Sequence, residues 1–247
     1  MKKIIAALLA LVTVFSAASV CLAENTSEFT DINEKSKYYD EIMFLNELGI
    51  ISGYEDNTFR PDNTVTRAEF TKMAVAALNG EEMIKQKEEE EKISLSKEYS
   101  FDDITEHWAR LYINHGAENK FISGYPDGTF RPDENVTYVQ AQKMLISAIG
   151  YETYAKNTGG WPNGYKMWAA SMGVTQGMDK IDDDTPLTRA QVAALIYNTM
   201  NTPLCVLDGY DITENGEASP RLLIMDGDGV EYRTLLTHYF GIDPDEK

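Results

Sequence analysis

The sequence predicts a mainly α protein built from tandem helix–loop–helix repeats. The stretch GYEDNTFRPDNTVT, residues 53–66, returns 71 positions later as GYPDGTFRPDENVT, and ten of the fourteen positions are identical. Apolar residues recur at helical spacing on both sides of each stretch, which indicates one buried helix before the loop and one after it. Repetition of this kind is typical of folds in which each copy buries its apolar face against its neighbours.

The chain begins with the features of a secretory signal peptide, residues 1–23. Two lysines precede an apolar run over residues 4–20, and Cys21 and Ala23 are small residues at the two positions that a signal peptidase reads. A membrane anchor is one alternative, since the run reaches the lower limit of a span, and lipid attachment at Cys21 is another. We expect cleavage after Ala23 and a secreted mature chain without a membrane span.

Charge and cysteine content limit the partners of the mature chain. The sequence holds 22 basic and 40 acidic residues, and removal of two lysines with the signal peptide leaves a net charge of −20. This charge disfavours nucleic acid and anionic lipid as partners, so an acidic ligand would have to be held by local arginines. Cys205 is the only cysteine left, and the fold must therefore be stabilised by buried cores rather than by disulfides.

The repeats follow one another in a fixed order. Repeat one, residues 29–79, and repeat two, residues 101–150, each combine an amphipathic helix pattern with a loop whose proline, glycine and aspartate cannot continue that helix. Residues 151–201 are a degenerate third copy, because MDKIDDDTPL replaces the loop there. Residues 80–100 are a charged linker or helical extension, and residues 202–247 form a small C-terminal segment of β character with Asp-Gly turns.

The second helix of each copy begins with a capping box. The threonine hydroxyl accepts a hydrogen bond from the amide three residues later, and the acidic or amide side chain there reaches back to the threonine amide. The three pairs are Thr66 with Glu69, Thr137 with Gln140, and Thr188 with Gln191. Helix formation explains these residues completely.

The residue that follows the capping threonine differs between the copies. It is Arg67 in copy one and Arg189 in copy three, but Tyr138 in copy two. A cation in the first turn of a helix is disfavoured by the helix dipole by about 0.3–1 kcal/mol, so another role must favour the arginines. One hypothesis is an anion pocket formed by the guanidinium and free helix amides. The other is an ion pair to an acidic residue of a neighbouring copy.

The order of these motifs resembles the S-layer homology domain. An F-x-D-I segment is followed by an aromatic helix start, then G-Y-x-D-G-T-F-R-P, then T-R-A-E, over residues 29–79 and 101–150 and more weakly over 161–200. The resemblance implies three copies in a pseudo-threefold arrangement around a helical bundle. It also implies a wall anchor that binds a peptidoglycan-linked secondary cell-wall polysaccharide, often through a pyruvylated sugar, and that uses no cofactor.

The resemblance places the ligand contacts at named positions. The arginine contact falls on Arg67 and Arg189, and the loop contacts fall on Ser52-Gly53 and Ser123-Gly124. Tyr138 departs from the pattern, so we expect the pocket centred there to be lost or reduced to stacking. The scaffold should be indifferent to the arginine, and Arg67→Ala should therefore leave thermal stability nearly unchanged.

The other conspicuous residues favour structural interpretations. Arg60 and Arg131 occur in both strong copies, which indicates that they tie the loop to a carboxylate such as Asp56 or Asp127. We interpret Trp108, Trp161 and Tyr38 or Tyr39 as core anchors, with a sugar platform as the alternative. Asp182–Asp184 and Asp226–Gly229 lack the spacing of a calcium loop and indicate turns. The sequence thus predicts no metal site.

The leading hypothesis is a secreted, non-enzymatic protein of the cell wall and S-layer, anchored non-covalently by its repeats. The alternative is a structural or assembly protein whose repeats pack against other surface-layer subunits. Catalytic motifs such as G-x-S-x-G, H-E-x-x-H and C-x-x-C do not occur in the sequence, so an enzyme is not expected.

Overall fold

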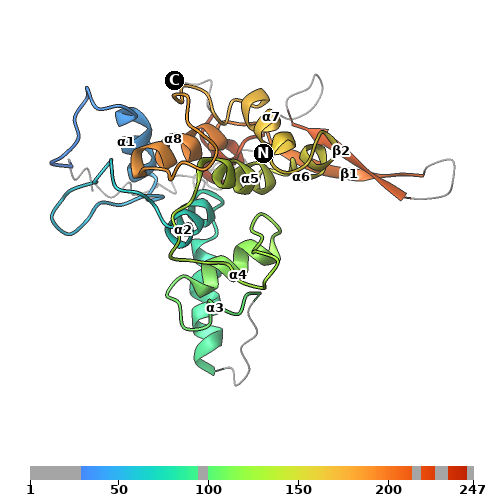
Figure 1. Ribbon diagram of the computed structural model, residues 1–247, viewed down its shortest axis with the longest axis horizontal. Helices are drawn as coiled ribbons and strands as arrows, with labels where there is room; N and C mark the ends of the chain where they lie inside the picture. Colours follow the sequence, from blue (N-terminus) through green and yellow to red (C-terminus); the bar gives the residue numbers. More distant parts are fainter. Residues whose placement is uncertain (1–28, 94–99, 213–217, 226–232, 244–247) are drawn as a thin grey trace, which may run out of the picture.

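The computed structural model describes residues 29–93, 100–212, 218–225 and 233–243. The predicted signal peptide and the Asp226–Gly229 turn lie outside these residues. Within them the protein is mainly α with one small antiparallel sheet near the C-terminus, which confirms the predicted fold class (Figure 1). No helix in the described part of the chain is both long and apolar enough to cross a bilayer.

Each copy contributes two main helices. The first helices of the three copies are α1 (Tyr39–Glu47), α4 (Arg110–Glu118) and α7 (Asn163–Ser171), and the second helices are α2 (Arg67–Ala77), α5 (Tyr138–Ala148) and α8 (Arg189–Met200). The second helices bury most of their side chains, whereas each first helix buries only two or three. The second helices therefore supply most of the central core.

Three short extended segments close a ring at the centre of the molecule. The Val65 amide donates to the Leu187 carbonyl at 3.0 Å, the Val136 amide to the Val65 carbonyl at 2.9 Å, and the Leu187 amide to the Val136 carbonyl at 3.0 Å. All three side chains are fully buried. Because each copy repeats the same bond to a different neighbour, the three copies are related by a pseudo-threefold arrangement.

The helices follow the same cyclic order. The second helix of each copy packs against the first helix of the next, α2 against α4, α5 against α7 and α8 against α1, and α8 also contacts α2 and α5. Apolar faces that a single copy could not bury are thus covered by its neighbours. The third helix pair takes its full place in this ring despite its divergent loop.

The loops of copies one and two are braced alike. The Asp31 carboxylate accepts from the amides of Phe59 and Arg60 at 2.7 Å each, and Asp103 does the same for the second copy at 2.8 and 2.7 Å. Arg60, whose backbone is left-handed with φ 59°, donates to Asp56 at 3.1 Å. These contacts support the structural role predicted for the loop arginines.

Arg131 repeats this arrangement in copy two. Its backbone has φ 58°, and its guanidinium donates to Asp127 at 3.0 Å. The hydrogen bonds from Thr129 and Arg131 lower the pKa of Asp127 to about 2. The short loop is therefore held by charge-assisted bonds on the surface as well as by its buried phenylalanine.

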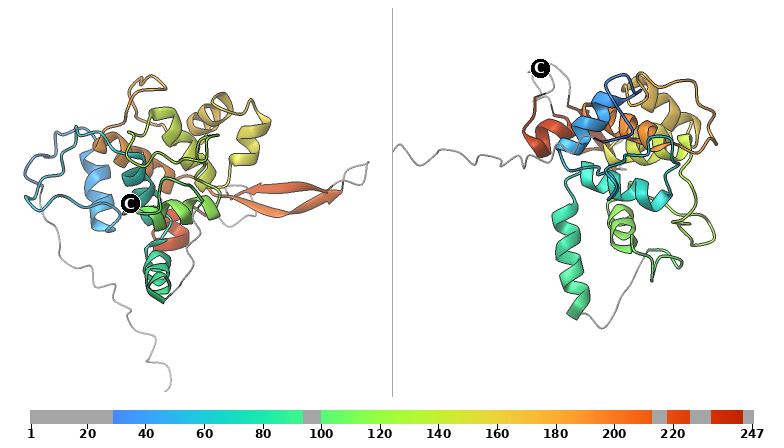
Figure 2. Two further views of the ribbon diagram at one scale, coloured as in Figure 1. Left: turned by 60° about the horizontal axis from the view of Figure 1, so that its bottom comes forward. Right: turned by 90° about the vertical axis from the view of Figure 1, so that its left-hand side faces the viewer.

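The remaining elements project from the helical body. Helix α3 (Glu81–Ile93) packs against α4 and extends beyond it, and the hairpin of β1 (Cys205–Ile212) and β2 (Ala218–Ile224) points away in a different direction (Figures 1 and 2). Cys205 pairs with Ile224 and Ile212 with Ala218, and the register shifts between Leu207 and Tyr210. Two short helices complete the described chain, α6 (Glu152–Asn157) and the π-helix η1 (Leu236–Phe240).

Candidate ligand grooves between the copies

The arginines that follow the capping threonines reach out of their own copy. Arg67 crosses from α2 to the loop of copy two, where Nε donates to the Phe130 carbonyl at 2.9 Å and an Nη donates to Gln140 Oε1 at 3.1 Å. Its guanidinium also lies over the rings of Phe130 and Tyr125, at 4.3 and 5.1 Å from their centroids. Arg67 therefore belongs to a junction between two copies.

A hollow of about 380 Å³ opens at this junction. We call it the Arg67 groove, and it is lined by Arg67, Ser123, Gly124, Tyr125, Pro126, Gln140, Lys143, Met144 and Trp161. These residues come from all three copies. The groove thus exists only in the assembled ring.

Arg189 repeats the arrangement at the junction of copy three with copy one. Its Nε donates to the Phe59 carbonyl at 2.8 Å and an Nη to the Ser52 carbonyl at 3.0 Å, and it lies over Tyr54 and Phe59. The hollow there, of about 250 Å³, is the Arg189 groove, lined by Ile50, Ile51, Ser52, Gly53, Tyr54, Glu69, Lys72, Met73, Trp108 and Arg189.

The structure tests the two hypotheses for these arginines. Neither Arg67 nor Arg189 forms an ion pair within the described residues, so the ion-pair hypothesis does not account for them. The scaffold is nevertheless not indifferent to Arg67, which is only 4% exposed and bridges two copies. Burial lowers the pKa of its guanidinium, because the charged form loses hydration. The expectation that the scaffold is indifferent to Arg67 is therefore wrong, because this side chain also holds two copies together.

The first amides of the second helices are already hydrogen-bonded. The part of the anion hypothesis that used free helix amides is therefore wrong. The first two amides of α2, those of Arg67 and Ala68, donate to the carbonyls of Glu134 and Pro132, and the third donates to the Thr66 hydroxyl. The corresponding amides of α5 and α8 donate to neighbouring loops in the same way. A bound anion would have to be held by side chains, because the ring itself uses the amides.

The predicted capping boxes at Thr66 and Thr188 are complete, whereas in copy two the Thr137 hydroxyl accepts no hydrogen bond and the back-bond to Gln140 remains. The back-bond from the threonine amide to the side chain three residues later is 2.8 Å for Thr66 and Glu69, 2.9 Å for Thr188 and Gln191, and 3.4 Å for Thr137 and Gln140. The last bond is long because the Gln140 oxygen also accepts from Arg67. In copy two the capping residue is shared between its helix and the groove.

The interpretation of the tryptophans as core anchors is wrong. Trp108 is 53% exposed and Trp161 is 52% exposed, and each lines one of the two grooves. Tyr38 and Tyr39, by contrast, are partly buried and pack against the core. An indole face half open to solvent beside a cation is the arrangement expected of a saccharide platform.

Two lysines complete the grooves, and sequence analysis missed them. Lys143 Nζ donates to the Ser123 hydroxyl at 2.5 Å and lies 5.6 Å from the centroid of Trp161. Burial lowers the pKa of Lys143. Lys72 holds the same position in the Arg189 groove. Their position in the repeat could have identified them, because both lysines stand six residues after a capping threonine. Copy three has Ala194 at that position.

The loop residues that the resemblance indicated as ligand contacts do line the grooves, and the structure also gives the serines and the glycines separate roles in the fold. The Ser52 carbonyl and the Ser123 hydroxyl position the cations. Gly53 and Gly124 are required by packing, because an added Cβ would lie 2.5 Å from Phe29 and 2.4 Å from Phe101 respectively. The glycines therefore serve the fold first.

The third junction lacks the arginine, the tryptophan and the lysine that the two grooves share. Tyr138 stands in the arginine position, is only 8% exposed, and carries a hydroxyl whose pKa is raised by burial. Lys37 stands two residues before α1, where the other copies have tryptophan, and forms an ion pair with Asp179 across the junction. Ala194 replaces the lysine. These substitutions support the expected loss of a pocket at Tyr138.

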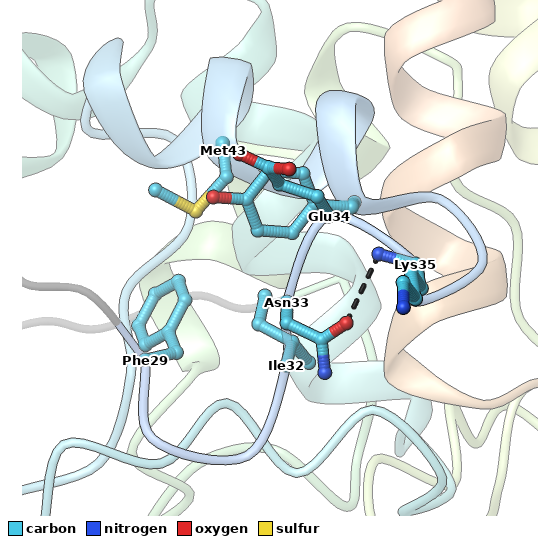
Figure 3. Close-up of a pocket in the computed structure, with 7 residues that line it drawn as sticks. Phe29, Ile32, Asn33, Glu34, Lys35 and Met43 are labelled. Atoms are coloured by element: carbon cyan, nitrogen blue, oxygen red, sulfur yellow. Dashed lines mark hydrogen bonds between the residues drawn. The ribbon is translucent and has the colours of Figure 1, made fainter.

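Another hollow, of about 350 Å³, lies at the start of copy one and is lined in part by Phe29, Asn33, Lys35 and Met43 (Figure 3). Its visible bond is a turn contact, from the Lys35 amide to Asn33 Oδ1 at 3.0 Å. In the described residues no three His, Cys, Asp or Glu side chains gather in a way that could hold a metal ion. The two arginine grooves are therefore the candidate sites.

Comparison with known proteins agrees with the motifs and the fold. A family model for the S-layer homology domain matches residues 28–71 and 100–141. The chain is an S-layer homology domain protein. Its location is accordingly the cell surface, in the S-layer. The third helix pair lies outside the matched residues, so its membership rests on the ring and on the capping box.

Curated relatives share much of this chain. The Middle cell wall protein of Brevibacillus brevis is 26% identical over 205 residues, which cover 83% of this chain and 18% of that protein. The Cell surface protein of Thermoanaerobacter kivui is 27% identical over 214 residues, which cover 86% of this chain and 26% of that protein. The Cellulosome-anchoring protein of Acetivibrio thermocellus is 30% identical over 121 residues, which cover 49% of this chain and 26% of that protein. The chain thus spans about a quarter or less of these relatives.

Proposed function

We propose that this S-layer homology domain protein anchors itself non-covalently to the cell wall, by binding acidic saccharide residues of a peptidoglycan-linked polysaccharide in the Arg67 and Arg189 grooves. The observation that carries the proposal is a repeated constellation. Each groove combines an arginine, buried in the case of Arg67 and half-buried in the case of Arg189, with a lysine and a half-exposed tryptophan, and the three come from different copies. If the copies shared only a scaffold, the fold would not require an arginine, a lysine and a tryptophan to occur together in both grooves.

The chemistry of the constellation suits a sugar acid. A guanidinium offers paired donors to a carboxylate, the lysine adds a second cation, and the indole provides an apolar face for a pyranose ring. Because the mature chain is strongly acidic, the grooves must supply this positive charge locally. A pyruvylated amino sugar fits the combination, and the mechanism requires no catalytic step and no cofactor.

The proposal is tested with purified wall sacculi. The chain should sediment with intact sacculi and should remain in solution when the secondary polymer has first been removed. The double variant Trp108→Ala/Trp161→Ala should lose retention, while Leu207→Ala, an exposed apolar residue of the hairpin, should keep it. Equal retention on intact and stripped sacculi would refute the proposal.

A second candidate is a structural protein whose repeats or hairpin pack against other surface-layer subunits. The specific observation is the β1–β2 hairpin, which projects from the body and carries Leu207 at 53% exposure (Figure 2). Light scattering that shows concentration-dependent oligomers, with no response to added polymer fragments, would favour this function. A monomer at all concentrations would count against it.

A further inference from the structure

The two grooves differ at one charged position, and this inference rests on the proposed function. Among their described lining residues, the Arg67 groove has two cations and no carboxylate, whereas the Arg189 groove has two cations and Glu69. Gln140 occupies the position equivalent to Glu69, three residues after the capping threonine. Capping accepts either residue, so the fold does not dictate the choice.

Gln140 contacts the ligand-facing arginine directly. Its Oε1 accepts from Arg67 at 3.1 Å, and its Nε2 donates to the Tyr125 hydroxyl at 3.2 Å. A carboxamide holds the guanidinium in place without cancelling its charge. A carboxylate at the same distance would form an ion pair with Arg67 and compete with a bound acid for it.

Glu69 has the opposite effect in its own groove. One carboxylate oxygen caps α2 through the Thr66 amide at 2.8 Å, and the side chain remains among the lining residues with Arg189 and Lys72. It therefore repels an acidic saccharide that these cations attract. At the short separations within such a groove, one unit charge changes anion affinity by roughly 3- to 10-fold in a partly solvated site.

Some of the charged groups behind the two grooves match. Behind the Arg189 groove, the Tyr112 hydroxyl donates to Glu81 at 3.1 Å, and behind the Arg67 groove Tyr165 bonds to Glu152 at the equivalent position. These acids occur on both sides and do not distinguish the sites. Among the lining residues, the Glu69 and Gln140 pair is the difference in charge. Outside the lining, the Glu134 carboxylate acts on Arg67, whereas the equivalent position beside Arg189 is the neutral Asn63.

We infer that Gln140 and Glu69 determine the ligand preference of the two grooves. The Arg67 groove selects acidic over neutral saccharide residues strongly, and the Arg189 groove selects them weakly. The protein would then bind a wall polymer through one charge-selective site and one more tolerant site. A polymer that carries acid groups on only some of its sugars can occupy both.

Fluorine NMR can follow the grooves separately. The chain has three tryptophans, and after labelling with 5-fluorotryptophan Trp161 reports the Arg67 groove and Trp108 the Arg189 groove. Trp168, which lines neither groove, is an internal reference. The probes are the methyl glycoside of a pyruvylated N-acetylhexosamine and the same sugar without pyruvate.

The expected result is a reciprocal change in two matched variants. Glu69→Gln should tighten pyruvylated-sugar binding in the Arg189 groove by roughly 3- to 10-fold, and Gln140→Glu should weaken it in the Arg67 groove by a similar factor. Neutral-sugar binding and the unmutated groove should not change. Both residues cap a helix, so melting temperatures should stay close to wild type.

The outcomes separate this inference from the proposed function. If both indoles respond to the sugars but the variants leave the preference for the pyruvylated probe unchanged, the inference is wrong and the anchoring function stands. The inference is also wrong, and the anchoring function still stands, if the variants change the affinity for both probes by the same factor. If neither indole responds to either probe at millimolar concentration, the proposed grooves and the inference both fail.

Discussion

Replacing Arg67 with alanine should destabilise the fold and weaken wall binding together. The side chain is 4% exposed and donates to the Phe130 carbonyl and to Gln140 across the junction of copies one and two. Its removal leaves a buried carbonyl unpaired and opens space between two aromatic rings. Loss of two hydrogen bonds from a charged donor, less the desolvation that the charge no longer requires, amounts to roughly 2–4 kcal/mol.

The measurement has two parts. For a chain of this size each kcal/mol lowers the melting temperature by about 2–4 °C, so thermal unfolding of Arg67→Ala should occur roughly 4–16 °C below wild type. Retention on sacculi is then measured well below that temperature and expressed per folded molecule. Arg221→Ala removes an exposed hairpin arginine that lines neither groove, and should change neither quantity appreciably.

Two results would contradict this account of Arg67. A melting temperature within 2 °C of wild type would mean that the bonds across the junction contribute nothing. Undiminished retention per folded molecule would mean that Arg67 is structural only, and the ligand contact would then have to lie with the lysine and tryptophan.

Three further predictions concern the scaffold. Thr66→Ala should lower the free energy of unfolding by roughly 1 kcal/mol through loss of the cap, measured by urea denaturation, with no effect on retention per folded molecule. Gly124→Ala should cost about 1–3 kcal/mol, because the new methyl group overlaps the Phe101 ring, and a full-stability variant would contradict that packing. The folded-state pKa of Asp127, about 2, lies below its unfolded value, so its contribution is present above about pH 4 and is lost as pH falls toward 2. Asp127→Asn should flatten that part of the melting-temperature profile, and an unchanged profile would show that the bonds from Thr129 and Arg131 are not maintained in solution.

The local features of this protein were predictable from the sequence because they depend on residues close together in the chain. A threonine and a glutamate three positions apart form a capping box in almost any context, and the Arg60 and Asp56 brace closes within one loop. The repeated loop likewise identified the copies and their family. Even the third copy could be recognised from Thr188 and the spacing to Trp161.

The grooves could not be predicted in the same way, because their parts come from different copies. Trp108 and Trp161 have the spacing of a buried helix start, and only the position of the neighbouring copy leaves them half exposed. The lysines at 72 and 143 look like ordinary surface cations in the sequence. Their role depends on which loop lies opposite.

The sequence by itself determined that there are repeats, where the second helix of each copy begins, and that copy two lacks the arginine. The tertiary structure decided what each arginine does, since Arg67 and Arg189 bond to carbonyls 63 and 130 positions away. The reason is the closed ring of three copies. Each copy leaves its own apolar face and its first helix amides incomplete, and the neighbour that completes them also forms the opposite wall of the groove.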